Sequence, residues 1–166
     1  MLSVLIETKN SEEGLARTLA SLVSGAIEGV VRDVIVCDLG STDQTHRVAE
    51  HAGCHLVTAG VAAAVRQAKG EWLLILEPGS RLAEGWIEPV LFHVEKQSTA
   101  ARFTPSRAGR KPFLARIFSR RRALSDGLLI AKGQWASRAS GVRSLQEIAH
   151  GLRTRRLTAE IVRAPK

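Results

Sequence analysis

The first 97 residues alternate short apolar runs with segments of helical periodicity, and this alternation constrains the fold more than any other feature. The runs at 2–6, 34–38, 54–57 and 71–76 are rich in Val, Leu and Ile and predict strands. Helices are predicted between them, and they end near Gly53 and Gly70, residues suited to the left-handed conformation beyond a helix. Strands alternating with helices favour an α/β domain with a mostly parallel sheet.

The remaining elements are predicted from weaker patterns. A helix is expected over 84–96, and because Pro89 lies inside its pattern we expect a kink or a late start there. Further along, the patterns indicate strands over 100–104, 127–132 and 156–162, and helices over 112–124 and 144–153.

The chain of 166 residues is long enough for one domain with a real core, and its charge is unevenly distributed. Residues 1–97 hold 8 Lys/Arg against 13 Asp/Glu, a net charge of −5, whereas residues 98–166 hold 16 against 3, a net charge of +13. A basic half indicates an anionic partner. The two cysteines, Cys37 and Cys54, lie in strand-like segments and are expected to be small buried residues without chemistry.

The apolar runs are too short to span a membrane and the N-terminus lacks a signal-peptide pattern, so we expect a cytoplasmic protein. The predicted helix 112–124 places apolar residues opposite arginines that include Arg120 to Arg122. It suits packing on its own sheet, or peripheral contact with an anionic surface at the inner face of a membrane. Nucleic acid is the least favoured partner, because the chain has few aromatic residues for base stacking.

Polar residues follow three predicted strands at the edge where ligands bind in open α/β sheets. They are Thr8 with Asn10, Asp38 with Ser41 and Asp43, and the segment from Glu77 to Ser80. Ser41 and Gln44 have the spacing of a capping box, so helix capping explains Ser41 in part. Capping does not require Asp38, which lies on the strand side of the turn, and this favours a ligand role for its carboxylate.

Three segments, SVLIETKNSEEGLARTLASL, VIVCDLGSTDQT and AKGEWLLILEPGSRLAEGW, together resemble the family 2 glycosyltransferases in order and spacing. The resemblance implies a GT-A type, Rossmann-like three-layer α/β/α sandwich in a single domain over 1–166, with a nucleotide-binding half at 1–97 and a basic acceptor-side half at 98–166. It also implies an inverting transfer of a sugar from a nucleoside-diphosphate donor.

The resemblance assigns the nucleotide base to Thr8 and Asp38, with Asn10 and Ser41 beside them. A carboxylate accepts the ring N–H of a uracil-type base, so a UDP-type donor is favoured. The family's metal motif falls on Glu77 and Gly79, so the last acid is missing and binding of Mn²⁺ or Mg²⁺ through Glu77 is weakened. A plain turn built on Pro78 and Gly79 explains the same segment.

The catalytic base of the family corresponds to Glu147, with Gln146 as its neighbour, and Asp126 corresponds to a residue that contacts the acceptor. Such a base removes the proton of the acceptor hydroxyl as that hydroxyl attacks. Glu147 also fits an exposed acid in the first turn of a helix. The alternative to an enzyme is a catalytically degenerate GT-A domain that binds a nucleotide or a protein partner.

Overall fold

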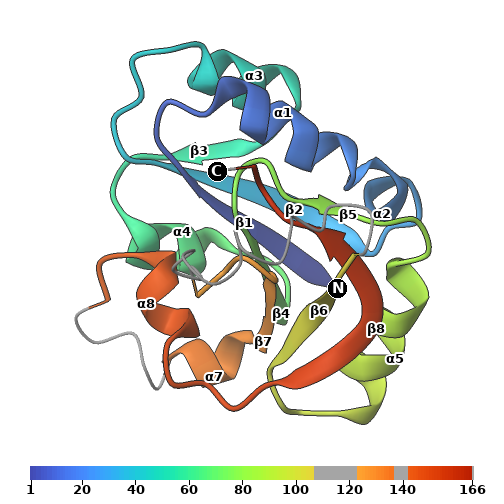
Figure 1. The fold of residues 1–166 in the computed structure, drawn as a ribbon. Coiled ribbons are helices and arrows are strands. Elements are labelled where there is room, and N and C mark those ends of the chain that lie inside the picture. Colours follow the sequence, from blue (N-terminus) through green and yellow to red (C-terminus); the bar gives the residue numbers. More distant parts are fainter. Residues whose placement is uncertain (107–122, 137–141, 166) are drawn as a thin grey trace, which may run out of the picture.

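In the computed structural model, an eight-stranded mixed sheet runs through the described residues, which are 1–106, 123–136 and 142–165 (Figure 1). The strands are β1 (Leu2–Thr8), β2 (Val31–Asp38), β3 (His55–Val57), β4 (Trp72–Leu76), β5 (Arg81–Leu82), β6 (Ala101–Pro105), β7 (Leu128–Ala131) and β8 (Arg155–Val162). Their spatial order is β3-β2-β1-β4-β7-β6-β8-β5. The pairs β1–β2, β1–β4, β2–β3 and β6–β8 are parallel, whereas β4–β7, β6–β7 and β5–β8 are antiparallel.

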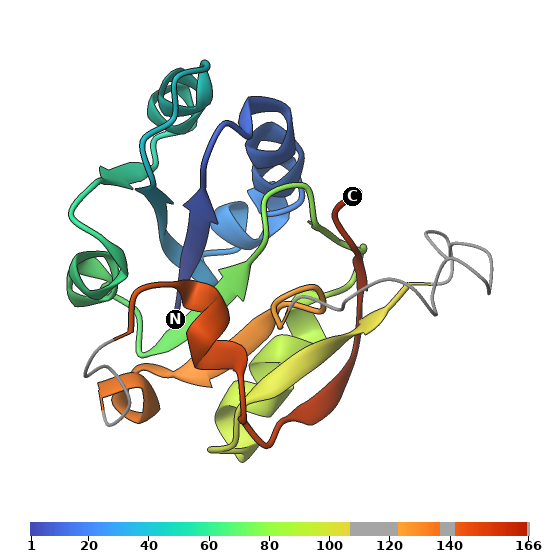
Figure 2. The same cartoon turned by 60° about the vertical axis from the view of Figure 1, so that its left-hand side comes forward.

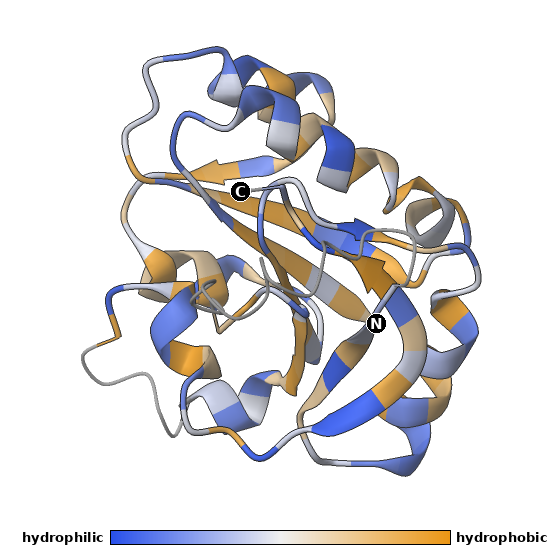
Figure 3. Ribbon diagram, in the orientation of Figure 1, coloured by the Kyte–Doolittle hydropathy of each residue, from blue (hydrophilic) through white to orange (hydrophobic). Residues whose placement is uncertain are grey.

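Helices cover both faces of this sheet and complete three layers (Figures 1 and 2). They are α1 (Glu12–Ala20), α2 (Val23–Ile27), α3 (Thr45–His51), α4 (Val61–Gln67), α5 (Ile87–Lys96), α7 (Lys132–Ala136) and α8 (Leu145–Ala149). One core contains buried residues of α1, α3 and α5, and the core on the opposite face contains buried residues of α4, α7 and α8. The central strands are mostly apolar, and hydrophilic residues gather on the helices (Figure 3).

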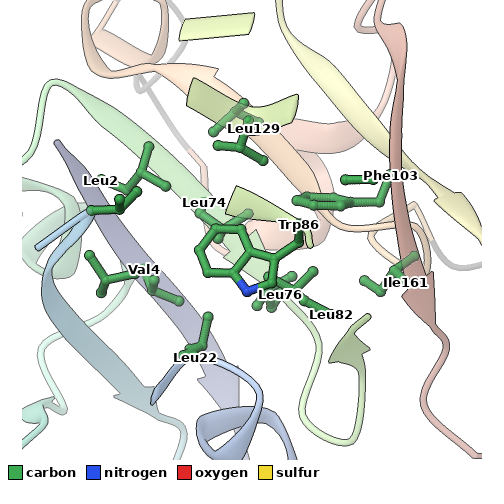
Figure 4. Packing of buried hydrophobic residues seen from close by; sticks show 14 of the residues in the cluster. Leu2, Val4, Leu22, Leu74, Leu76, Leu82, Trp86, Phe103, Leu129 and Ile161 are labelled. Carbon is green, nitrogen blue, oxygen red and sulfur yellow. The ribbon is translucent and has the colours of Figure 1, made fainter. Parts of the chain in front are cut away.

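The period of two along each strand assigns its side chains to the two cores. In β1, Val4 and Ile6 belong to one core and Leu5 to the other, so the strand is apolar without interruption. Trp86 lies among the side chains of the first core (Figure 4). A Cβ on Gly25 would stand 2.6 Å from the Trp86 ring, so this position requires glycine.

Most predicted elements are present with shifted ends. Helix α5 begins at Ile87, so Pro89 lies in its first turn and the predicted late start is confirmed. Gly53 follows the end of α3 with a φ of 70°, as predicted. Helix α8 is shorter than the predicted 144–153, and the short elements α2, β5 and α7 were not predicted. The predicted basic helix 112–124 lies almost entirely outside the described residues.

No helix within the described ranges has both the length and the apolar character that crossing a membrane requires.

Candidate functional site

A cavity of about 730 Å³ opens at the carboxyl ends of the parallel strands. Register places Thr8 of β1 opposite Asp38 of β2, and Ile6 opposite Leu76 of β4, so Glu77 follows β4 beside the end of β1. The cavity is lined by Glu7, Thr8, Lys9, Ser11, Leu39, Leu76, Glu77, Pro78, Ala123, Leu124, Gln146 and His150. It therefore lies at the edge where an open α/β sheet binds its ligands.

Thr8 contributes a hydroxyl that the protein does not satisfy. Thr8 is 2% exposed, and its Oγ1 has no hydrogen-bond partner among the described residues. A buried polar group left without a partner costs about 1–3 kcal/mol. Thr8 also lines the cavity, so its unsatisfied hydroxyl lies in a residue of the cavity wall.

Asp38 is 8% exposed and lies beside the cavity without lining it. Its Oδ2 accepts a hydrogen bond from the Ser41 backbone N–H at 3.0 Å, and its Oδ1 accepts one from the Ser41 hydroxyl. These bonds hold the carboxylate in the turn that follows β2. Each oxygen retains a second lone pair, so Asp38 can still accept a bond from a ligand.

Asn10 and Ser41 join the loop after β1 to the loop after β2. The backbone N–H of Asn10 donates to Ser41 Oγ at 2.9 Å, and the backbone N–H of Thr42 donates to Asn10 Oδ1 at 2.7 Å. Neither residue lines the cavity. The structure thus places Asn10 and Ser41 near Thr8 and Asp38. The side chains of Asn10 and Ser41 connect the two loops and do not line the cavity.

Asp43 of the GSTDQT segment caps α1, and Glu12 of α1 in turn caps α3. The Glu12 N–H of α1 donates to Asp43 Oδ2 at 3.2 Å, and the Gln44 N–H before α3 donates to Glu12 Oε2 at 2.9 Å. The predicted capping box of Ser41 and Gln44 is wrong, because α3 begins at Thr45 and Ser41 bonds Asp38 instead. The hydroxyl of Thr45 donates to Asp43, and this bond lowers the pKa of Asp43 below its usual value.

Glu77 is 7% exposed and faces α8 across the cavity. Its Oε1 accepts a hydrogen bond from Gln146 Nε2 at 2.6 Å, and Gln146 Oε1 accepts one from the Leu124 N–H at 3.1 Å. Within the described residues no group of three or more His, Cys, Asp or Glu is placed to hold a metal ion. Mg²⁺ and Mn²⁺ favour several oxygen ligands. Glu77, the one acid of the family's metal motif that remains, is already bonded to an amide and is a poor ligand for such an ion.

Helix α8 is held to the sheet by Glu7. Its carboxylate accepts hydrogen bonds from the Ser144 hydroxyl at 3.1 Å and from the Leu145 N–H at 2.7 Å. Gln146 and His150 follow at a spacing of four residues, which places them on one side of the helix, and both line the cavity.

Glu147 is not brought to the cavity. It is exposed, does not line the cavity, and its Oε2 accepts a hydrogen bond from the Arg143 N–H at 3.0 Å. Its role as a base stays a prediction, and in this structure its carboxylate caps its own helix.

Asp126 is likewise engaged elsewhere. Its Oδ2 lies 2.8 Å from Arg156 Nη1, and its Oδ1 lies 2.7 Å from Arg163 Nε. Both arginines belong to β8 or directly follow it, so Asp126 anchors this strand and does not line the cavity.

Burial raises the pKa of Cys37 and Cys54 to about 11, so neither thiol is a ready nucleophile at neutral pH.

Among the cavity residues that sequence reasoning missed are Glu7, Lys9, Leu39 and His150. Glu7 and Lys9 flank Thr8 in the chain, and their position at a strand end was the available signal. Leu39 directly follows Asp38, and His150 stands one helical turn after Gln146. Strand-end position and helical spacing identify these residues better than residue type does.

The model of the glycosyl transferase family 2 matches residues 3–122, which is more than half of the chain. The chain belongs to glycosyl transferase family 2. A TPR repeat-containing protein of Synechococcus elongatus is 32% identical over 134 residues, which cover 72% of this chain and 32% of that protein.

Solved structures show that this family 2 chain has the GT-A fold, as predicted. Residues 1–349 of S. aureus TarS in complex with UDP-GlcNAc align with a TM-score of 0.63 and 20% identity, over 99% of this chain and 56% of that one. Glucosyl-3-phosphoglycerate synthase from Mycobacterium tuberculosis, in complex with Mn²⁺, UDP and glucosyl-3-phosphoglycerate, aligns with a TM-score of 0.58 and 16% identity, over 82% and 58%. The chain spans less than two thirds of each of these relatives.

Proposed function

We propose that this chain binds a nucleoside-diphosphate sugar in the cavity and transfers the sugar to an acceptor with inversion. The observation that carries the proposal is Thr8, a residue that lines a cavity at the ends of parallel strands and whose buried hydroxyl has no partner in the described structure. Structural neighbours crystallised with UDP or UDP-GlcNAc support a donor of this class.

Thr8 and Asp38 are the proposed contacts of the base. The free lone pairs of Asp38 suit the ring N–H of uracil, and the Thr8 hydroxyl can donate to a ring carbonyl or accept from that N–H. Leu39, which is 45% exposed and lines the cavity, offers an apolar surface beside them. Asn10 and Ser41 act in this proposal by holding the two loops in register.

In the proposed reaction, an acceptor oxygen attacks the anomeric carbon as the bond from that carbon to the diphosphate oxygen breaks. The acceptor proton passes to a base on the enzyme. The family resemblance assigns this role to Glu147, which must leave its bond to Arg143 to reach the cavity. His150 already lines the cavity, and an imidazole is a common general base.

A second candidate function is nucleotide binding without turnover. Its specific support is Gln146, because a side-chain amide that cannot act as a base occupies the cavity beside Glu77. Contact of Asp126 with the acceptor is a further proposal. In the structure, its carboxylate forms ion pairs with Arg156 and Arg163.

The deciding experiment follows release of UDP from a panel of UDP-sugars by the purified chain and by the variants Asp38→Ala, Glu147→Gln and His150→Gln. Turnover that is lost in Asp38→Ala supports the transferase. The base is then Glu147 or His150, whichever residue gives a glutamine variant that binds UDP normally but no longer forms UDP from the UDP-sugar. UDP binding without turnover on any donor would favour the binding module.

Contact with an anionic membrane surface is a separate proposal that rests on the sequence of residues 112–124, most of which lie outside the described residues. Co-sedimentation with anionic vesicles tests it, with neutral vesicles and an Arg120–Arg122 triple glutamine variant as controls. Salt-sensitive binding only to anionic vesicles, reduced in the variant, would support it.

A further inference from the structure

The turn after β4 disfavours an acid at the position where the family carries the last acid of its metal motif. Gly79 has a φ of 91°, which is costly for any residue with a side chain. A Cβ at this position would stand 3.2 Å from the Cβ of Ala164 and 3.4 Å from Cδ of Pro165. The C-terminal segment also lies beside the loop after β4 in Figure 1. This space is therefore occupied by the chain itself.

Hydrogen bonds hold that turn in place. The Gly79 N–H donates to the Gly14 carbonyl at 2.8 Å and to Thr18 Oγ1 at 2.9 Å. The Ser80 hydroxyl donates to the Glu77 carbonyl at 2.6 Å. The glycine thus belongs to a turn that is anchored to α1.

The two acids that remain in the cavity bond to α8 or its N-terminal flank. Glu77 accepts from Gln146, and Glu7 accepts from Ser144 and Leu145. A divalent ion bound at Glu77 would compete with the hydrogen bond of 2.6 Å from Gln146. Among the described residues, Glu77 belongs to no group of three or more acids, histidines or cysteines that could together hold the ion.

A diphosphate still requires positive charge, and Lys9 is placed to supply it. Lys9 directly follows Thr8, is exposed and lines the cavity. Its ammonium forms no ion pair with an acid among the described residues. Lysine binds phosphate as a point charge, and its four-carbon stem gives the charge a wide reach.

On the basis of the proposed function, we propose that this cavity binds the donor diphosphate without a divalent cation and that Lys9 supplies the compensating charge. Thr8 and Asp38 then hold the base at the ends of β1 and β2, while Lys9 contacts the phosphates next to them.

Calorimetric titration of the whole chain with UDP and with uridine tests the proposal, in EDTA and in Mn²⁺ or Mg²⁺. We expect UDP to bind in EDTA with an affinity that either ion changes by less than about threefold. Lys9→Gln should weaken UDP about 10- to 100-fold in EDTA, the size expected for one charge-assisted contact, and leave uridine unchanged. Lys96→Gln makes the same substitution at an exposed residue of α5 outside the cavity and should alter neither affinity.

The possible failures are distinguishable. UDP binding that requires Mn²⁺ or Mg²⁺ would overturn this inference and leave the proposed function standing. Unchanged UDP affinity in Lys9→Gln would overturn the role of Lys9. Absence of both UDP and uridine binding, with and without metal, would overturn the proposed function and this inference with it. Circular dichroism and thermal unfolding of each variant show that it is folded before its affinity is compared.

Discussion

Replacing Glu7 by alanine should release α8 from the sheet while the rest of the fold persists. The Glu7 carboxylate accepts two hydrogen bonds from the start of α8, at 3.1 Å and 2.7 Å. Hydrogen bonds to charged groups contribute about 1.5–3 kcal/mol each, and because Glu7 is half-buried we discount each for solvent screening to about 1 kcal/mol, which gives about 2 kcal/mol for the pair. Such a loss increases the population of the opened helix about 30-fold.

Hydrogen exchange over residues 142–150, measured by mass spectrometry in the regime where opening is in rapid equilibrium, reports this population directly. Exchange in Glu7→Ala should accelerate there by one to two orders of magnitude, and much less in β1 and β4. Glu13→Ala is the matched control, because the Glu13 side chain is 78% exposed and pairs only with Arg17. Unchanged exchange of α8 in Glu7→Ala would refute the reasoning that Glu7 holds this helix.

Three further predictions concern stability, each measured by urea or thermal unfolding. Gly70→Ala should destabilise the protein by about 2–4 kcal/mol, because its Cβ would stand 2.5 Å from the Ser3 backbone nitrogen. Gly133→Ala, in the open on α7, should instead stabilise it by about 0.5–1 kcal/mol, and equal effects of the two changes would contradict the steric argument. Asp126→Asn should cost about 1–2 kcal/mol, a value reduced because its partners Arg156 and Arg163 are 51% and 35% exposed, and a neutral effect would show that the ion pairs add nothing. The hydrogen bond from Thr45 is the main reason why the pKa of Asp43 is lowered in the folded protein. The stability that ionised Asp43 contributes is therefore fully present above the unfolded pKa of about 3.9. It is lost as the pH falls through the folded pKa. Asp43→Asn should therefore flatten the loss of stability below about pH 4, and an unchanged pH profile would exclude this contribution.

The parallel half of the sheet could be predicted from sequence because its signal is local. Strands β1 and β4 are buried on both faces, so each is an apolar run, and glycines or polar turns mark their ends. The other half depends on contacts between distant segments. Strand β6 pairs with β8 across about fifty residues, and the two-residue strand β5 exists only because it pairs with β8.

The site was predictable to the same extent. Asp38 is proposed as a ligand contact from its position at the end of a strand, before any partner is known. Glu7 could not be assigned, because its partners Ser144 and Leu145 lie 137 and 138 residues away. The capping-box role of Ser41 was predicted wrongly because a helix cap and a bond to Asp38 both suit a serine in a turn, and only the start of α3 at Thr45 decides between them.

The placement of Glu147 illustrates why residue type is a poor guide to a catalytic position on a helix. Ser144 and Glu147 have the capping-box spacing, and Ser144 is the N-cap, since its hydroxyl accepts from the Gln146 N–H at 3.0 Å. The Glu147 carboxylate accepts from the Arg143 N–H, as a capping acid at the third helical position does, one residue earlier than in the standard box. Once the cap defines where α8 begins, the rotation of about 100° per residue directs Gln146 and His150 toward the cavity and Glu147 away from it. The same acid that resembles a catalytic base is therefore explained by helix capping, and catalysis by Glu147 requires its carboxylate to leave the Arg143 N–H.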